Sequence, residues 1–142
     1  MNPVSDRSPL QRFVDAQAGV YENVVAELRA GQKRTHRMWF VFPQIAGLGL
    51  SPNSVFYALA SLDEARAYAD HAVLGARLRE CAGLALAVEG RTARRIFGEI
   101  DARKFQSSMT LFSVAEADEA VFAQCLEKFF GGGRDAATLA RI

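Results

Sequence analysis

The chain has 142 residues, of which 50% are hydrophobic and 23% are charged, and its formal net charge is +1. This composition is typical of a globular protein and excludes a disordered or fibrous chain. The small net charge argues against a dedicated nucleic-acid binder, and no apolar run approaches the roughly 20 residues that span a bilayer.

The first predicted elements are helical. Apolar residues between Leu10 and Leu28 recur at every third or fourth position, which predicts a buried helical stripe. Gly19 interrupts this stripe and can divide it into two shorter helices. Gly31 follows the stripe and is a natural C-terminal stop, because glycine readily adopts the left-handed conformation that ends many helices.

The helical pattern breaks at residues 38–43, which read Met-Trp-Phe-Val-Phe-Pro. Pro43 forbids a long helix here and disfavours a central strand, because proline lacks the backbone N–H that both structures use. We therefore predict irregular structure, and a short strand pair around residues 40–45 is left open. After two further glycines, Pro52 can begin a short helix near Asn53.

Capping signals predict the remaining helices. Ser61 and Glu64 form a capping box, in which each side chain satisfies a backbone donor, at the start of a helix that runs to about residue 70. A helical stripe between residues 74 and 88 then ends at Gly90. The other predicted N-caps, each placed before an apolar stripe, are Thr92, Asp101, Asp118 and Asp135.

No segment shows convincing alternation with a period of two, and no long linker separates domains. The sequence therefore predicts an all-α fold, a compact single domain of about six to eight short helices with an irregular segment that contains proline and glycine. We expect this helical domain to span residues 10–142 and to follow a flexible tail at residues 1–9.

Cysteine and histidine usage bears on cofactors and on the compartment. The two cysteines and two histidines lack the spacing of a zinc or iron–sulfur site, so we expect no metal and no other cofactor. A chain of this length needs no disulfide bond to fold. The polar N-terminus lacks the apolar core of a signal peptide. These features predict a cytoplasmic protein that does not enter a membrane.

The densest group of unusual side chains lies at residues 33–44, where basic residues precede large aromatic ones. His36 and Arg37 can hold an anion such as a phosphate or a carboxylate, and Trp39 can stack on a planar ring. Simpler interpretations stay open. The aromatic side chains are also explained as core residues, and His36 is either an acid or base in a pocket or an ordinary surface or core histidine.

A second group lies on the helix predicted after residue 101. Lys104, Ser107 and Ser108 fall within one helical turn, since positions three and four apart share a helix face. A partly buried lysine beside hydroxyl groups can bind an oxyanion or lower the pKa of a serine nucleophile. The alternative is that the serines are packing residues bonded to preceding carbonyl groups and the lysine is solvated. No motif of a named hydrolase class is present.

Separated blocks of the chain also match a known pattern. They are Leu10–Gln17, Arg37–Gln44 with Gly47–Gly49, Ser61–Ala65 and Ser107–Phe112. Together they resemble DUF1810, a bacterial family of unknown function whose members are sometimes labelled calpastatin, and the resemblance extends from Leu10 almost to Ile142. It implies a small, mainly helical protein and no transferable activity. Nothing in the sequence resembles a disordered protease inhibitor.

The two groups chosen on chemical grounds coincide with blocks of this resemblance. If they meet in space, they line one polar-rimmed aromatic pocket, so we predict that the protein binds a small anionic or nucleotide-like ligand. An enzyme acting on a nucleotide-derived or phosphate-bearing molecule and a protein-interaction module are the alternatives. The candidate ligand-binding residues are His36, Arg37, Trp39, Gln44, Lys104, Ser107 and Ser108.

Overall fold

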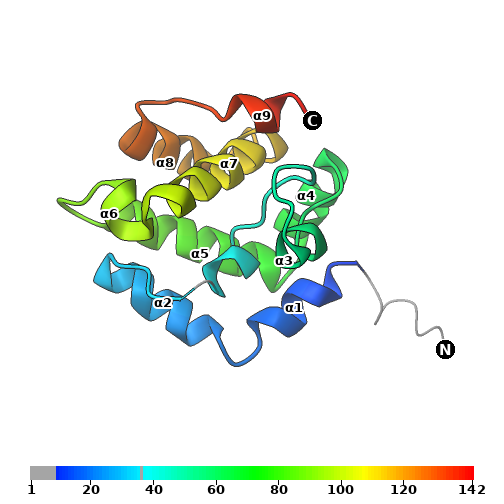
Figure 1. The fold of residues 1–142 in the computed structure, drawn as a ribbon, viewed down its shortest axis with the longest axis horizontal. Coiled ribbons are helices and arrows are strands. Elements are labelled where there is room, and N and C mark those ends of the chain that lie inside the picture. Colours follow the sequence, from blue (N-terminus) through cyan, green and yellow to red (C-terminus); the bar gives the residue numbers. More distant parts are fainter. Residues whose placement is uncertain (1–8, 36) are drawn as a thin grey trace.

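The computed structural model describes residues 9–35 and 37–142, and the regular structure in these residues is helical (Figure 1). The all-α prediction is confirmed. The described chain has nine α-helices, slightly more than expected, because three of them have only four or five residues. The predicted tail falls mainly on residues 1–8, which lie outside the described residues. No helix in the described chain is long and apolar enough to cross a membrane.

The helices of the described residues follow the chain in the order of Figure 1, and the 3-10 helix η2 is among them. They are α1 (Gln11–Gln17), α2 (Tyr21–Ala30), η2 (Arg37–Phe40), α3 (Pro52–Phe56), α4 (Leu62–Asp70), α5 (Leu74–Ala87), α6 (Ala93–Phe97), α7 (Glu99–Ala115), α8 (Ala120–Phe130) and α9 (Ala136–Leu139).

Gly19 divides the first helical stripe as predicted. Its φ of +77° lies in the left-handed region, which strains residues that carry a Cβ atom, and the chain bends sharply there between α1 and α2 (Figure 1). Gly31 ends α2 with a φ of +68°, and its N–H bonds to a carbonyl group of the last turn.

The predicted caps are partly confirmed. The side chains of Ser61, Thr92 and Asp135 accept hydrogen bonds from backbone N–H groups in the first turns of α4, α6 and α9. The capping box is shifted by one residue, since the Glu64 carboxylate accepts from the N–H of Ala60, 2.9 Å away.

Two predicted caps are wrong. Asp101 lies inside the first turn of α7, which begins directly after Gly98, and its carboxylate pairs with Lys33 at 2.9 Å. Asp118 precedes Glu119, the N-cap residue of α8, and this N-cap makes no side-chain hydrogen bond. In neither place does an aspartate side chain cap the helix.

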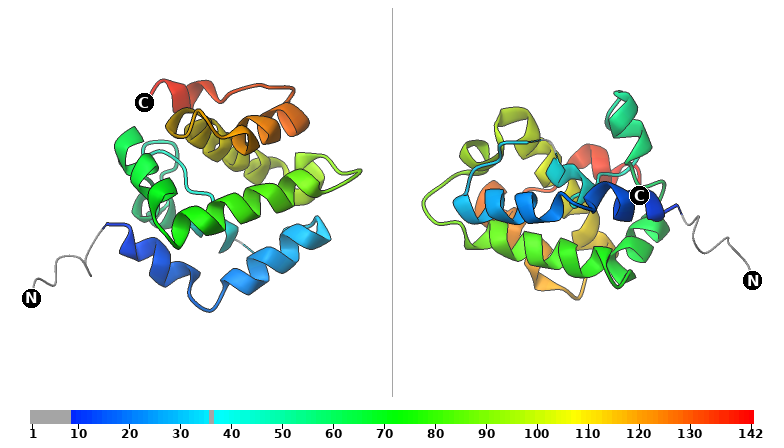
Figure 2. Two further views of the ribbon diagram at one scale, coloured as in Figure 1. Left: turned by 180° about the vertical axis from the view of Figure 1, so that it is seen from behind. Right: turned by 90° about the horizontal axis from the view of Figure 1, so that it is seen from below.

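The irregular segment after η2 leads into a loop closed at its base. The only β-structure in the described chain is a single parallel bridge between Ile45 and Leu59, so the strand pair left open by the sequence is reduced to one bridge. The N–H of Ala46 donates to the carbonyl of Leu59, and the N–H of Leu59 donates to the carbonyl of Gln44. The loop between these points, residues 46–58, is called the α3 segment here; it projects from the body of the molecule (Figure 2).

The apolar core joins the irregular segment to the helices. Helix α5 packs against both α2 and α8, and α7 packs against α4, α6, α8 and α9. Phe42 and Phe105 are fully buried, and their rings meet edge to face at 5.2 Å. This contact brings residues 38–44 against the middle of α7, so the two groups of candidate residues are neighbours in space.

Candidate functional site

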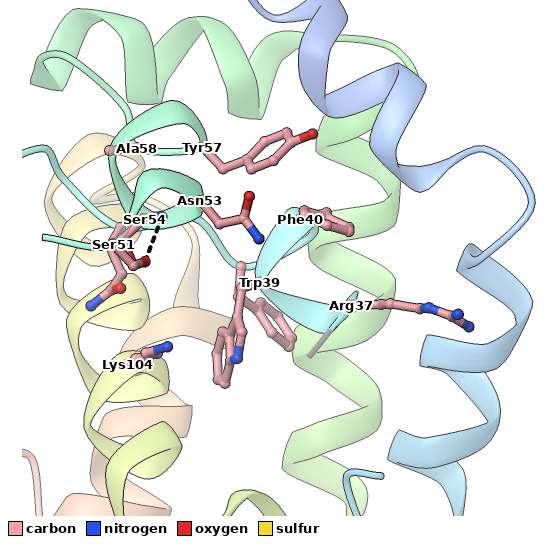
Figure 3. A pocket seen from close by; sticks show the side chains of 11 residues that line it. Arg37, Trp39, Phe40, Ser51, Asn53, Ser54, Tyr57, Ala58 and Lys104 are labelled. Atoms are coloured by element: carbon pink, nitrogen blue, oxygen red, sulfur yellow. Dashed lines mark hydrogen bonds between the residues drawn. The ribbon is translucent and has the colours of Figure 1, made fainter. Parts of the chain in front are cut away.

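A pocket of about 280 Å³ lies where η2, the α3 segment and α7 come together (Figure 3). Its lining comes from parts of the chain that are far apart in sequence. Aromatic side chains and small polar side chains dominate it, and Lys104 adds a positive charge. The lining residues are Arg37, Trp39, Phe40, Phe42, Gln44, Ser51, Asn53, Ser54, Tyr57, Ala58 and Lys104.

The first wall of the pocket is η2 with the residues that follow it. Buried side chains of other helices hold its backbone. The Tyr68 hydroxyl of α4 lies 3.0 Å from the carbonyl oxygens of both Phe40 and Val41, and the side-chain amide of Gln17 in α1 donates to the Phe40 carbonyl at 2.7 Å. Because Tyr68 and Gln17 are both fully buried, these bonds fix the path of the backbone that carries Trp39 and Phe40.

The second wall is the α3 segment. Ser51 caps α3 by accepting a hydrogen bond from the Ser54 N–H at 3.1 Å, and its hydroxyl donates to the Ser54 hydroxyl at 2.8 Å. Figure 3 shows the two serines bonded to each other. Tyr57 follows α3, and its ring packs on that of Phe40 at 4.7 Å between ring centroids. This aromatic contact joins the second wall to the first.

Lys104 of α7 forms the cationic edge. Its Nζ atom lies 5.8 Å from the centre of the Trp39 ring, a cation–π distance, and Figure 3 shows the amine directed toward that ring. Asp101 lies 3.5 Å from Lys104 but only 2.9 Å from the nearly buried ammonium group of Lys33. One carboxylate is therefore shared between two ammonium groups, which leaves positive charge at the edge of the pocket.

Arg37 contributes less charge to the pocket than the sequence implied. It lines the pocket, but Figure 3 shows its guanidinium extending away from Trp39 and Lys104. Lys104 is thus the cation that faces the cavity in the described structure. No aspartate or glutamate is found among the described lining residues, and the nearby carboxylate of Asp101 is paired with Lys33 and Lys104.

The structure separates the seven sequence candidates. Arg37, Trp39, Gln44 and Lys104 line the pocket. His36 lies outside the described residues, and the two serines of α7 do not line the pocket. Ser107 Oγ lies 3.0 Å from the carbonyl oxygen of Arg103 and 3.2 Å from the Asp135 carboxylate, while Ser108 is fully buried without a hydrogen-bond partner in the described chain. The placement of Ser107 agrees with the alternative interpretation, a packing serine bonded to a preceding carbonyl group.

Sequence reasoning missed the polar residues of the second wall, Ser51, Asn53, Ser54 and Tyr57. A local signal existed, since Ser51 and Pro52 mark a helix start and three small polar residues fall within four positions. That signal predicts a capped helix but not which side of it faces Trp39. The facing side is decided by contacts with distant residues.

The thiols of the described chain lie apart from this site. Burial raises the pKa of Cys81 to about 11 and that of Cys125 to about 12, so both stay protonated and unreactive near neutral pH. The described residues contain no group of three or more histidine, cysteine, aspartate or glutamate side chains that could hold a metal ion. A ligand in the pocket can stack on aromatic rings, form hydrogen bonds with polar side chains and contact the ammonium group of Lys104.

Fold and pocket together define a small all-α protein with an aromatic pocket that is cationic at one edge. The chain belongs to the family described as Protein of unknown function (DUF1810), whose model matches residues 7–142, and the resemblance seen in the sequence is thereby confirmed. It is similar to the conserved hypothetical protein Rv1873 from Mycobacterium tuberculosis, at 55% sequence identity and a TM-score of 0.90, with 92% of this chain and 94% of that chain covered. No curated protein matches the chain.

Proposed function

We propose that this pocket binds a small anionic ligand that carries a planar ring, such as a nucleotide-like molecule. One observation carries the proposal. Trp39 and Lys104 belong to separate blocks of the sequence, yet they line the same cavity with 5.8 Å between the ammonium nitrogen and the ring centre. An aromatic wall suits a planar ring, and an ammonium group suits a phosphate or a carboxylate.

The volume of the pocket limits the size of the ligand. At about 280 Å³ it lies just below the range of about 300–1,000 Å³ that is usual for drug-sized ligands. One ring with one anionic group fits such a space, whereas a dinucleotide would extend into solvent. We therefore favour nucleoside monophosphates and aromatic carboxylates over larger molecules.

The described part of the lining offers groups that can bind a ligand. Its titratable groups in the described chain are Arg37, Tyr57 and Lys104, and carboxylate and thiol groups are missing from it. A general acid or base that works near neutral pH is usually an imidazole or a perturbed carboxylate. An enzyme acting on the same ligand stays the alternative, because His36, the acid or base considered from the sequence, lies outside the described residues.

The cysteines support the cytoplasmic location predicted from the sequence. Cys81 and Cys125 are both free and buried in the described chain. Free thiols are usual in a reducing compartment, whereas secreted proteins commonly pair them. Fractionation of cells that express the protein, with immunodetection in each fraction, tests the location.

Binding is tested by titration of the purified protein with nucleoside monophosphates, ribose 5-phosphate and benzoate. Trp39 is the only tryptophan of the chain, so a change in its fluorescence reports on the pocket itself. Thermal unfolding is recorded in parallel. A ligand at 100 times its dissociation constant adds about 2.7 kcal/mol to the free energy of unfolding, which corresponds to a rise of about 5–10 °C in melting temperature.

Variants assign a positive result to the pocket. Lys104→Met removes the charge and keeps most of the apolar stem, so we expect affinity for phosphate-bearing ligands to fall about tenfold or more. The control is Arg66→Gln on α4, which removes an exposed cation that lies outside the lining and should bind as the original protein does. Equal affinity in Lys104→Met and the original protein would contradict the proposal.

Failure of the whole panel would favour the interaction module instead. The α3 segment exposes three large apolar side chains, with Leu50 at 92%, Val55 at 64% and Phe56 at 57% exposure. Apolar side chains gathered on one projecting segment are typical of contact surfaces. In that case sedimentation should show a concentration-dependent mass that is lost in Phe56→Ser.

A further inference from the structure

The α3 segment has few apolar contacts to hold it in place. Helix α3 buries none of its residues, and Val55 and Phe56 are mostly exposed. The bridge between Ile45 and Leu59 closes the base of the segment but does not reach its tip. Segments with little buried apolar surface open at low free-energy cost. The position of the second wall therefore depends on the packing of the Tyr57 ring against Phe40 and Phe13 and on a small number of polar contacts.

Arg12 of α1 supplies the strongest of these contacts. Its Nε atom donates to the carbonyl of Phe56 at 2.8 Å, and its Nη2 atom donates to the carbonyl of Ala58 at 2.7 Å. The same Nη2 atom lies 3.3 Å from the Glu64 carboxylate, and Nη1 donates to the carbonyl of Pro9. The side chain of Arg12 is only 17% exposed, and its bonds to Ala58 and Glu64 are partly buried, which strengthens these charged hydrogen bonds.

We infer that Arg12 is the positioning residue of the pocket, the group that holds the second wall at its distance from the first. Its two acceptors flank Tyr57, the residue whose ring packs on Phe40 and lines the cavity. With the backbone fixed on both sides of Tyr57, the ring cannot swing away from the first wall. The expected effect of Arg12 on ligand binding rests on the proposed function, whereas the hydrogen bonds that position Tyr57 do not depend on it.

This role also gives helix α1 a part in the site, although none of its described residues lines the pocket. The two polar residues of α1 that reach the pocket backbone hold one wall each. Gln17 donates to the carbonyl of Phe40 in the first wall, and Arg12 donates to carbonyls at the end of the second wall. Helix α1 thus sets the spacing of both walls although it lies outside the cavity.

A guanidinium group is needed to bond both carbonyl groups at once, because the carbonyls of Phe56 and Ala58 accept from different nitrogen atoms of Arg12. Separate nitrogen atoms of a planar fork reach Phe56 and Ala58, while Glu64 orients the fork from the side. A lysine carries one nitrogen and cannot bridge the same carbonyl groups with the same geometry. Arg12→Lys is therefore expected to behave like Arg12→Gln and not like the original protein.

The test uses hydrogen exchange of the unliganded full-length chain. In Arg12→Lys and Arg12→Gln, amide exchange in peptides covering residues 50–58 should accelerate by about tenfold or more, because charged hydrogen bonds are lost. Exchange in α5 should not change. Acrylamide should also quench Trp39, the only tryptophan, more strongly in both variants, because the wall that faces it is released. Arg66→Gln, which removes an exposed cation on α4, is the matched control.

Two results would overturn the inference. One is unchanged exchange of residues 50–58 in both Arg12 variants, and the other is full retention of the original behaviour in Arg12→Lys alone. Faster exchange of residues 50–58 in the Arg12 variants would support the positioning role. If at the same time neither the original protein nor any variant binds a ligand of the panel, the proposed function is contradicted. Where the panel does yield a ligand, its affinity should fall in both Arg12 variants and stay constant in Arg66→Gln.

Discussion

The carbonyl oxygens of Phe40 and Val41 show how distant side chains shape the first wall. Both oxygens lie 3.0 Å from the hydroxyl of Tyr68, which also accepts a hydrogen bond from the amide of Gln17 at 3.2 Å. Arg77 completes the cluster by donating to the other atom of that amide at 3.2 Å. A buried carbonyl group that loses its hydrogen-bond donor still carries the free-energy penalty of its removal from water, and no hydrogen bond offsets that penalty. The cluster therefore stabilises the wall and specifies its path.

Tyr68→Phe removes one oxygen atom from this cluster. We expect the free energy of unfolding to fall by about 1–3 kcal/mol, because the Val41 carbonyl is left buried without this donor. Urea denaturation measures the change. The matched control is Tyr57→Phe, whose hydroxyl has no hydrogen-bond partner in the described chain and whose loss should change stability by less than about 0.5 kcal/mol. Equal effects of the two substitutions would show that the cluster is not stabilising.

At the scale of elements, the contact of α4 with α5 depends on a residue without a side chain. Gly75 is buried in the first turn of α5, and a Cβ atom there would lie 2.0 Å from the carbonyl oxygen of Ala69 in α4. Real atoms do not approach so closely, and the obstacle is backbone. Gly83 lies farther along the same helix, and a Cβ atom there would meet nothing within 4 Å.

These two glycines predict opposite outcomes for the same substitution. Gly83→Ala should stabilise the protein by up to about 1 kcal/mol, because alanine has the higher helix propensity and the site has room. Gly75→Ala gains the same propensity but forces α4 and α5 apart, so we expect a net loss of about 1–3 kcal/mol. Thermal and urea unfolding of both variants decide the matter. A stabilised Gly75→Ala protein would mean that the close contact between α4 and α5 is not needed.

The helix boundaries show which elements a sequence can predict. Thr92 and Asp135 are correct caps because each precedes its helix directly and bonds to a backbone N–H three residues later. Asp101 carries the same local signal but is taken into α7, because Gly98 starts the helix and Lys33, far away in the chain, pairs with the carboxylate. At Asp101, a contact with a residue far away in the chain thus overrides the local capping signal.

At the scale of the whole molecule, the pocket exists only in the folded chain. Trp39 and Lys104 could be chosen from the sequence because a tryptophan beside basic residues and a lysine beside hydroxyls are chemically unusual. Their meeting depends on the contact of Phe42 with Phe105, and the second wall depends on Arg12. A sequence pattern specifies which residue types are present but not which distant elements pack together. For that reason Asn53 and Tyr57 were not predicted.

The core also makes the stability of the whole molecule sensitive to alkaline pH. Cys81 of α5 and Cys125 of α8 are fully buried, and burial raises their pKa values from 9.0 to about 11 and about 12. Burial raises the pKa of Tyr68 in the same direction. In each case the folded protein retains a proton that the unfolded chain has already released.

We therefore expect the contribution of the two thiols to the free energy of unfolding to be constant below pH 9 and to decrease above pH 9. Between pH 9 and about 11, the unfolded chain binds fewer protons than the folded one, so the free energy of unfolding decreases as pH rises, by up to about 1.4 kcal/mol per pH unit for each thiol. Urea denaturation between pH 7 and about 10.5, in the presence of a reductant, measures how the free energy of unfolding depends on pH. Replacing both Cys81 and Cys125 by alanine removes their contribution, while titratable groups that contact neither thiol titrate equally in both proteins. The difference in stability between the two proteins should therefore shrink above pH 9, and a constant difference would show that these thiols are not held protonated by the core.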